Sequence, residues 1–253
     1  MAGMAFSLSA NSKRMSDAKA GLREFQTKLF EAAWVPATGT IPRARQKLMI
    51  VLHGKGDSLR SFESLREELN APGMNYLLLQ APKKYLDGFS WYPSEPRHGR
   101  SIRETRARLF RLVRELNKAG WKSEDLFWLG HSQGCLVACD LVLNHPHSFG
   151  GLVGVSGYVW FFKGWRQKAL NSGALRTPWL LTHGTRDRVI FPREIRQDVS
   201  QLLAGEVPVL YREFSKGHDF DYRKEVPFIR RWLMRPLSLR LSEAKTKAES
   251  ASR

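Results

Sequence analysis

Short apolar runs recur along the chain, and they restrict its fold more than any other feature. Most of these runs lack the polar–apolar alternation of a strand with one wet face, so they indicate strands covered on both faces. Strands of that kind are typical of a parallel sheet. The predicted strands are Lys47–Leu52, Tyr76–Gln80, Leu126–Leu129, Leu152–Val155, Trp179–Thr182 and Val207–Tyr211.

Helical patterns lie between these runs. In Arg193–Ala204, apolar residues recur every three or four positions, Pro192 stands at the start and Gly205 follows the end, as expected for a helix. Strands that alternate with helices predict an α/β fold with a mostly parallel central sheet and helices on both faces. The other predicted helices are Ser61–Leu69, Ser101–Lys118, Gln133–Leu143 and Glu225–Met234.

The length of 253 residues, without repeats or an internal linker, suits one large domain. We expect it to span residues 17–239. Residues 1–16 and 240–253 are polar and small enough to predict flexible tails. Arg23–Val35 fits either an amphipathic helix or an edge hairpin whose second strand ends at Pro36, and we favour the hairpin.

Gly130-His131-Ser132-Gln133-Gly134 matches the G-x-S-x-G pattern of a nucleophile elbow. The pattern is short, but an apolar strand runs into it and an apolar helix leaves it, which is the context that a true elbow requires. The flanking glycines are expected because a Cβ there would crowd the strand and the helix. Ser132 is therefore the predicted nucleophile, held on a strained turn.

A serine hydroxyl needs a base, and the base needs an acid that orients it. With this elbow the chain order is Ser, then Asp or Glu, then His. Asp187 follows the strand Trp179–Thr182, and His218 lies in the loop after the strand at Val207. Asp219 and Asp221 are weaker candidates for the acid, because neither follows its own strand.

An oxyanion formed by attack on an acyl carbon needs two preorganised N–H donors. One should be the backbone of Gln133, directly after the nucleophile. The other should come from the loop His53–Ser58, where two glycines allow close approach to a substrate, and the predicted donor is the N–H of Lys55. His53 precedes the elbow and is interpreted as a structural brace of this loop.

Taken together, these motifs resemble the carboxylesterase/phospholipase family that includes the acyl-protein thioesterases. The resemblance implies the α/β-hydrolase fold and a serine hydrolase that cleaves carboxylic esters or thioesters without a cofactor or a metal. Lysophospholipase and dienelactone-hydrolase-like activities stay open, as does a non-catalytic basic binding protein on the same scaffold. The motifs are residues 52–57 (LHGKGD), 130–134 (GHSQG), 155–158 (VSGY), 184–189 (GTRDRV) and 217–220 (GHDF).

The resemblance also implies substrate-binding roles for three aromatic residues. Trp91 falls in the segment that borders the acyl-binding cleft in such enzymes, and Trp160 and Phe161 fall on a cleft-lining loop. Ordinary packing under that loop explains the last two equally well. Two residues depart from the pattern of the family: Lys55 replaces the usual apolar residue at the oxyanion position, and His131 replaces a common aromatic in the elbow.

The net charge of +17 arises from 41 Lys and Arg against 24 Asp and Glu. These charges are spread along the chain, so we expect no specific nucleic-acid partner. The arginines of Arg97–Arg114 are predicted to lie on the solvated face of a helix.

No apolar run is long enough to span a bilayer, and no secretory signal is evident, so we expect a cytoplasmic monomer or homodimer. Its partner would be a small ester or thioester, an acylated protein or a lysophospholipid. Cys135 and Cys139 are expected to be buried, unbridged thiols.

Overall fold

A central sheet organises the chain, and the computed structural model describes residues 25–93 and 98–251 of it. Among these residues, seven strands form the sheet in the order β1-β3-β2-β6-β7-β8-β9. All neighbouring strands run parallel except β1, which is antiparallel to β3. The predicted mostly parallel sheet is confirmed. The strands are β1 Ala32–Val35, β2 Lys47–Leu52, β3 Met74–Leu79, β6 Leu126–His131, β7 Gly151–Val155, β8 Trp179–Gly184 and β9 Val209–Phe214.

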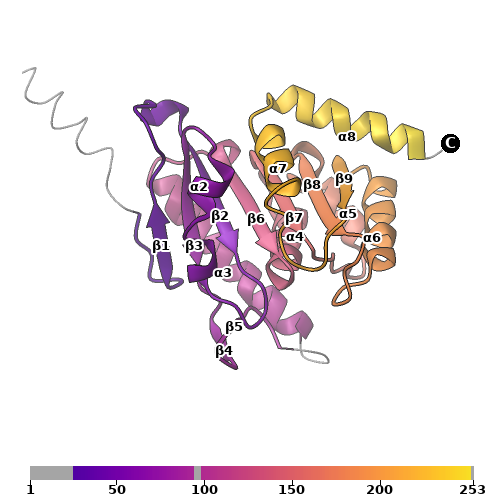
Figure 1. Cartoon of the computed structure of the whole chain (residues 1–253), viewed down its shortest axis with the longest axis horizontal. Coiled ribbons are helices and arrows are strands. Elements are labelled where there is room, and N and C mark those ends of the chain that lie inside the picture. The colour runs from indigo at the N-terminus through magenta and orange to yellow at the C-terminus, as the bar shows by residue number, and fades with distance from the viewer. Residues whose placement is uncertain (1–24, 94–97, 252–253) are drawn as a thin grey trace, which may run out of the picture.

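Each central strand sends apolar side chains to both faces of the sheet, which explains the continuous apolar runs. In β2, Ile50 packs into one core and Val51 into the other. The first core lies under α3 (His98–Lys118), α4 (Gln133–Asn144), α5 (Trp165–Leu170) and α6 (Pro192–Ala204). The second lies under α2 (Leu65–Leu69) and α7 (Glu225–Leu233). Helices therefore cover both faces, as predicted (Figure 1).

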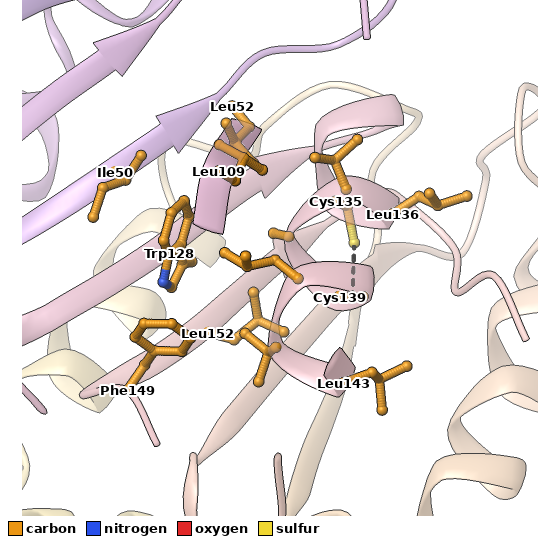
Figure 2. Packing of buried hydrophobic residues seen from close by; sticks show 14 of the residues in the cluster. Ile50, Leu52, Leu109, Trp128, Cys135, Leu136, Cys139, Leu143, Phe149 and Leu152 are labelled. Atoms are coloured by element: carbon orange, nitrogen blue, oxygen red, sulfur yellow. Dashed lines mark hydrogen bonds between the residues drawn. The ribbon is translucent and has the colours of Figure 1, made fainter. Parts of the chain in front are cut away.

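Helix α4 is the most deeply buried helix of the site region, because every residue in it is buried. Figure 2 shows its apolar side chains against Trp128 of β6 and Leu152 of β7. Cys135 and Cys139 are free thiols with 3.9 Å between their sulfur atoms. The expectation of buried, unbridged cysteines is confirmed.

The arginine-rich helix α3 begins at His98, three residues before the predicted start. Ile102 and Leu109 on its inner face are buried, whereas Arg103 and Arg111 are exposed. This arrangement confirms a mainly solvated arginine face. Within the described residues, no helix is both long and apolar enough to cross a membrane.

The predicted hairpin over residues 23–35 is wrong for the part that is described. Residues 25–31 form no strand, and β1 pairs with β3 instead, with Trp34 opposite Leu77. The edge of β3 supplies the hydrogen-bond partners that a hairpin would otherwise supply. Residues 23 and 24, and the predicted tail over 1–16, lie outside the described residues.

The predicted C-terminal tail, residues 240–253, is helical over most of its length, because α8 (Leu237–Ala251) extends through it. Arg240 is 5% exposed and Ala244 is 1% exposed. The arginine stacks over Phe127 and Trp232, with its Cζ about 5 Å from each ring. Burial of a single arginine among aromatic rings leaves no apolar pattern in a polar sequence, so the prediction missed it.

Candidate active site

Ser132 lies on the turn between β6 and α4 with φ +52° and ψ −116°, a conformation that is costly for a residue with a side chain. A Cβ on Gly130 would lie 2.3 Å from the carbonyl oxygen of Gly134. A Cβ on Gly134 would lie 2.2 Å from the carbonyl oxygen of Leu52 in β2. The glycines thus permit the close packing of strand, turn and helix that the elbow pattern predicts.

Three side chains from separate loops form one hydrogen-bonded chain. His218 Nε2 lies 2.9 Å from Ser132 Oγ, and His218 Nδ1 lies 2.8 Å from Asp187 Oδ2. The loops follow β6, β8 and β9, whose carboxyl ends meet at one edge of the sheet. The structure therefore brings together the serine, histidine and aspartate that the sequence selects.

Asp187 is 2% exposed, yet its carboxylate is well provided with donors. Its Oδ1 accepts the backbone N–H groups of Val189 at 2.9 Å and Ile190 at 3.0 Å. Burial alone would raise the pKa of Asp187, but the hydrogen bonds from His218, Ile190 and Val189 outweigh it and lower the pKa. The carboxylate thus remains charged beside His218 at neutral pH. His183 Nε2 lies 3.3 Å from Asp187 Oδ2.

The two alternative acids contact other groups. Asp221 Oδ1 accepts the N–H groups of Arg223 and Lys224, both at 3.0 Å, next to the start of α7. Asp219 is exposed. Asp187 is the carboxylate that reaches His218 Nδ1.

The two expected oxyanion donors belong to segments that lie next to Ser132. Gln133 is the first residue of α4, where a backbone N–H has no carbonyl partner within the helix. The loop before Lys55 passes close to the elbow, since a Cβ on Gly54 would lie 3.4 Å from Ser132 Cβ. These N–H groups form a candidate oxyanion hole.

A hairpin that the sequence analysis missed supports this loop. It consists of β4 (Lys83–Tyr85) and β5 (Gly88–Ser90). Gly56 N–H donates to the Phe89 carbonyl at 2.8 Å, and Phe89 N–H donates to the Asp57 carbonyl at 2.9 Å. The hairpin therefore fixes the backbone next to Lys55.

Trp91 lies in the core, where it is 0% exposed, and not on the wall of an open cleft as expected. Its Nε1–H donates to the His53 carbonyl at 2.8 Å, and its N–H donates to Gln133 Oε1 at 2.8 Å. The indole is buried because these contacts bind it between the loop after β2 and α4. His53 is also buried, and Ala81 N–H donates to its Nε2 at 3.0 Å, which agrees with a bracing role.

The two other aromatic candidates differ in their surroundings. Trp160 lines a cavity of about 840 Å³ together with Lys83, His98 and Arg103. Phe161 is partly buried against the core, with its ring 4.7 Å from the ring of Trp165. Trp160 is therefore the better placed of the pair to contact a ligand.

Two residues near His218 have structural contacts that no motif predicts. His131 Nε2–H donates to the His218 carbonyl at 3.1 Å, and burial lowers the pKa of His131 to about 4. Lys216 is 6% exposed and its ammonium group lies 2.7 Å from Glu225 Oε2. A lysine two residues before the histidine is the only sequence signal for this contact, and it does not reveal that the side chain turns inward.

Comparisons with known proteins agree with this architecture. The chain is 31% identical over 178 residues to acyl-protein thioesterase 1 of Yarrowia lipolytica, covering 64% of this chain and 76% of the relative. It is 27% identical to a probable inactive carboxylesterase of Oryza sativa subsp. japonica, covering 78% and 87% of the two chains.

Two solved structures share the fold. Arabidopsis thaliana SOBER1 superposes with a TM-score of 0.68 at 23% identity, over 78% of this chain and 99% of the other. Zea mays acyl-protein thioesterase 2 superposes with a TM-score of 0.67 at 22% identity, over 84% and 99%. Residues 40–224 match the phospholipase/carboxylesterase family. The chain therefore belongs to the phospholipase/carboxylesterase family and has its α/β-hydrolase fold.

Proposed function

We propose that this chain is a serine esterase or thioesterase that works through an acyl-enzyme on Ser132. The observation that carries the proposal is the unbroken hydrogen-bonded chain from Ser132 Oγ through His218 to Asp187. Membership of the phospholipase/carboxylesterase family and similarity to a thioesterase support the same reaction class.

In this mechanism, His218 Nε2 takes the proton of Ser132 as Oγ attacks the acyl carbon. Asp187 accepts the Nδ1–H of His218, orients the ring and stabilises its positive charge. His218 then donates the proton to the departing alcohol or thiol. Water repeats the sequence on the acyl-enzyme and releases the acid.

The backbone N–H groups of Lys55 and Gln133 stabilise the oxyanion in this proposal. Because both donors are backbone groups, a lysine at position 55 leaves this chemistry intact. Trp160 is the proposed contact for an acyl or leaving group, since it lines a cavity of about 840 Å³. The partly buried Phe161, which follows Trp160 in the same loop, is the second proposed contact.

A fluorophosphonate probe and a short p-nitrophenyl ester test the proposal together. The wild-type protein should be labelled at Ser132 and should hydrolyse the ester. Ser132→Ala should lose labelling and at least about 10⁴-fold of the ester rate, while keeping its thermal unfolding temperature. Full activity in Ser132→Ala would refute the nucleophile.

The second candidate is a non-catalytic protein on the same scaffold, and the similarity to a probable inactive carboxylesterase favours testing it. An unlabelled wild-type protein that binds an anionic partner in a salt-sensitive way would support it. If the protein is active, p-nitrophenyl and acyl-thioester substrates of graded chain length will separate carboxylesterase, thioesterase and lysophospholipase activities.

A further inference from the structure

A buried ion pair joins the loop that carries His218 to the start of α7. The ammonium of Lys216 lies 2.7 Å from Glu225 Oε2 at the start of α7. Lys216 is 6% exposed and Glu225 is 0% exposed. Burial lowers the pKa of Lys216, and the charge of Glu225 opposes that effect. Charges of this kind are retained in a protein interior only when they are paired.

The ammonium also donates to two further acceptors. One is Ser156 Oγ at 2.9 Å, and the other is the carbonyl oxygen of Asp219 at 3.0 Å. Ser156 directly follows β7 and has φ +49°. Lys216 thus joins the end of β7, the loop that carries His218 and the start of α7 through one group with three donors.

The backbone around Lys216 is fixed from the other side as well. Arg186 N–H donates to the Lys216 carbonyl at 3.0 Å, next to Asp187. Glu225 Oε2 also accepts the N–H of Asp221 at 3.0 Å, on the far side of His218. The pair therefore connects Lys216, before the histidine, with Asp219 and Asp221 after it.

Resting on the proposed function, we propose that the Lys216–Glu225 pair is a positioning device for the reaction. It fixes the loop over residues 216–221 so that His218 Nε2 lies at Ser132 Oγ while Nδ1 meets Asp187. A buried ion pair contributes little net stability compared with apolar residues of similar size, so the role assigned to this pair is the geometry that it imposes. A displacement of about 1 Å between reacting groups lowers a rate by roughly 100-fold.

The test compares Lys216→Met, Glu225→Leu and the double variant with the wild type. Each single change leaves one buried charge unpaired and should lower the thermal unfolding temperature. The double variant should recover much of that temperature because both charges are gone. Its kcat for a p-nitrophenyl ester should nevertheless stay roughly 10- to 100-fold below wild type, with KM changed by less than about 2-fold.

Two further variants keep the comparison sharp. Ser156→Ala removes one acceptor of the ammonium without exposing a charge, and it should lower kcat about 3-fold or more. The matched control is the partly buried pair Arg106–Asp140, whose atoms lie 3.4 Å apart between α3 and α4. The double variant Arg106→Met/Asp140→Leu should leave kcat within about 2-fold of wild type.

Wild-type kcat in both the Lys216/Glu225 double variant and Ser156→Ala would overturn the proposal and reduce the pair to a structural contact. An equal loss of kcat in the control pair would overturn it too. The rate of solvent exchange of the His218 Nδ1 proton, measured by NMR, should rise in the double variant. A wild-type protein that does not hydrolyse the ester would refute the proposed esterase. Independently of activity, an unchanged exchange rate of this proton in the double variant would refute the positioning role.

Discussion

His131 shows how a single side chain near the reacting atoms can make the stability of the fold depend on pH. Its ring lies 5.2 Å from the rings of both His218 and Phe220. Burial is the main cause that lowers its pKa to about 4, and the neighbouring charge of Lys216 adds to that effect. The ring therefore stays neutral and donates to the backbone of the very loop that carries the proposed base.

This shift predicts acid sensitivity. The unfolded chain binds a proton at His131 below about pH 6.5, whereas the folded chain resists it until about pH 4. Stability is therefore present above pH 6.5 and is lost as pH falls from about 6.5 to 4, with a loss of about 2 kcal/mol at pH 5. His131→Phe should show a smaller drop in the free energy of unfolding between pH 7 and pH 5, measured by urea denaturation at both values.

The comparison rests on the pH dependence, because the variant also loses the hydrogen bond to the His218 carbonyl at every pH. Equal drops for the two proteins would show that His131 is not the group responsible.

At the same scale, the sequence predicts those site residues whose position follows from a strand end. Ser132, Asp187 and His218 each come after an apolar run, and parallel strands bring their carboxyl ends together. Lys216 lies in the same loop as His218. Its side chain is polar, and no sequence pattern indicates that it points into the protein. Trp91 was misplaced for a related reason, because an aromatic residue in a loop looks the same whether it lines a cleft or fills the core.

At the scale of elements, the β4–β5 hairpin explains how the glycine-rich loop after β2 keeps a fixed position beside the elbow. The hairpin was not predicted, because each of its strands is only three residues long and β4 is exposed. Its hydrogen bonds reach Gly56 and Asp57, the two residues that follow Lys55. The long apolar strands and amphipathic helices, in contrast, could be predicted within a few residues of their observed ends.

Gly88→Ala tests this support. A Cβ at Gly88 would lie 2.1 Å from the carbonyl oxygen of Gly56, so the hairpin must move away from the loop. If the Lys55 N–H is an oxyanion donor, kcat should fall by up to about 100-fold. Steady-state kinetics on a p-nitrophenyl ester measures the effect.

The control is Lys84→Ala, an exposed change on the same hairpin that leaves the contact at Gly56 in place. It should keep kcat close to wild type. A wild-type kcat in a folded Gly88→Ala protein would show that the hairpin does not position the donor.

At the scale of the whole molecule, the candidate site lies at one end of the sheet and the C-terminal helix α8 packs at the other. The site lies at the carboxyl ends of the strands, on the side where the β4–β5 hairpin projects, whereas α8 packs on the opposite side (Figure 1). Arg240 of α8 donates through Nη1 to the carbonyl of Gly150, which precedes β7, at 2.5 Å. Strand order and this closing helix depend on long-range contacts, so local periodicity could not predict them.

This separation predicts that α8 contributes to stability without contributing to the reaction. Arg240→Leu leaves the Gly150 carbonyl without its donor and removes the cation–π contacts with Phe127 and Trp232, a loss of about 2–3 kcal/mol. In a chain of this size the thermal unfolding temperature should fall by roughly 4–10 °C. Because Gly150 lies at the amino end of β7, kcat at 25 °C should match wild type.

Leu239→Ala, at an exposed neighbour, should change neither quantity. An unchanged unfolding temperature in Arg240→Leu would show that the contact does not stabilise the fold, and a lowered kcat would show that the two ends of the sheet are coupled.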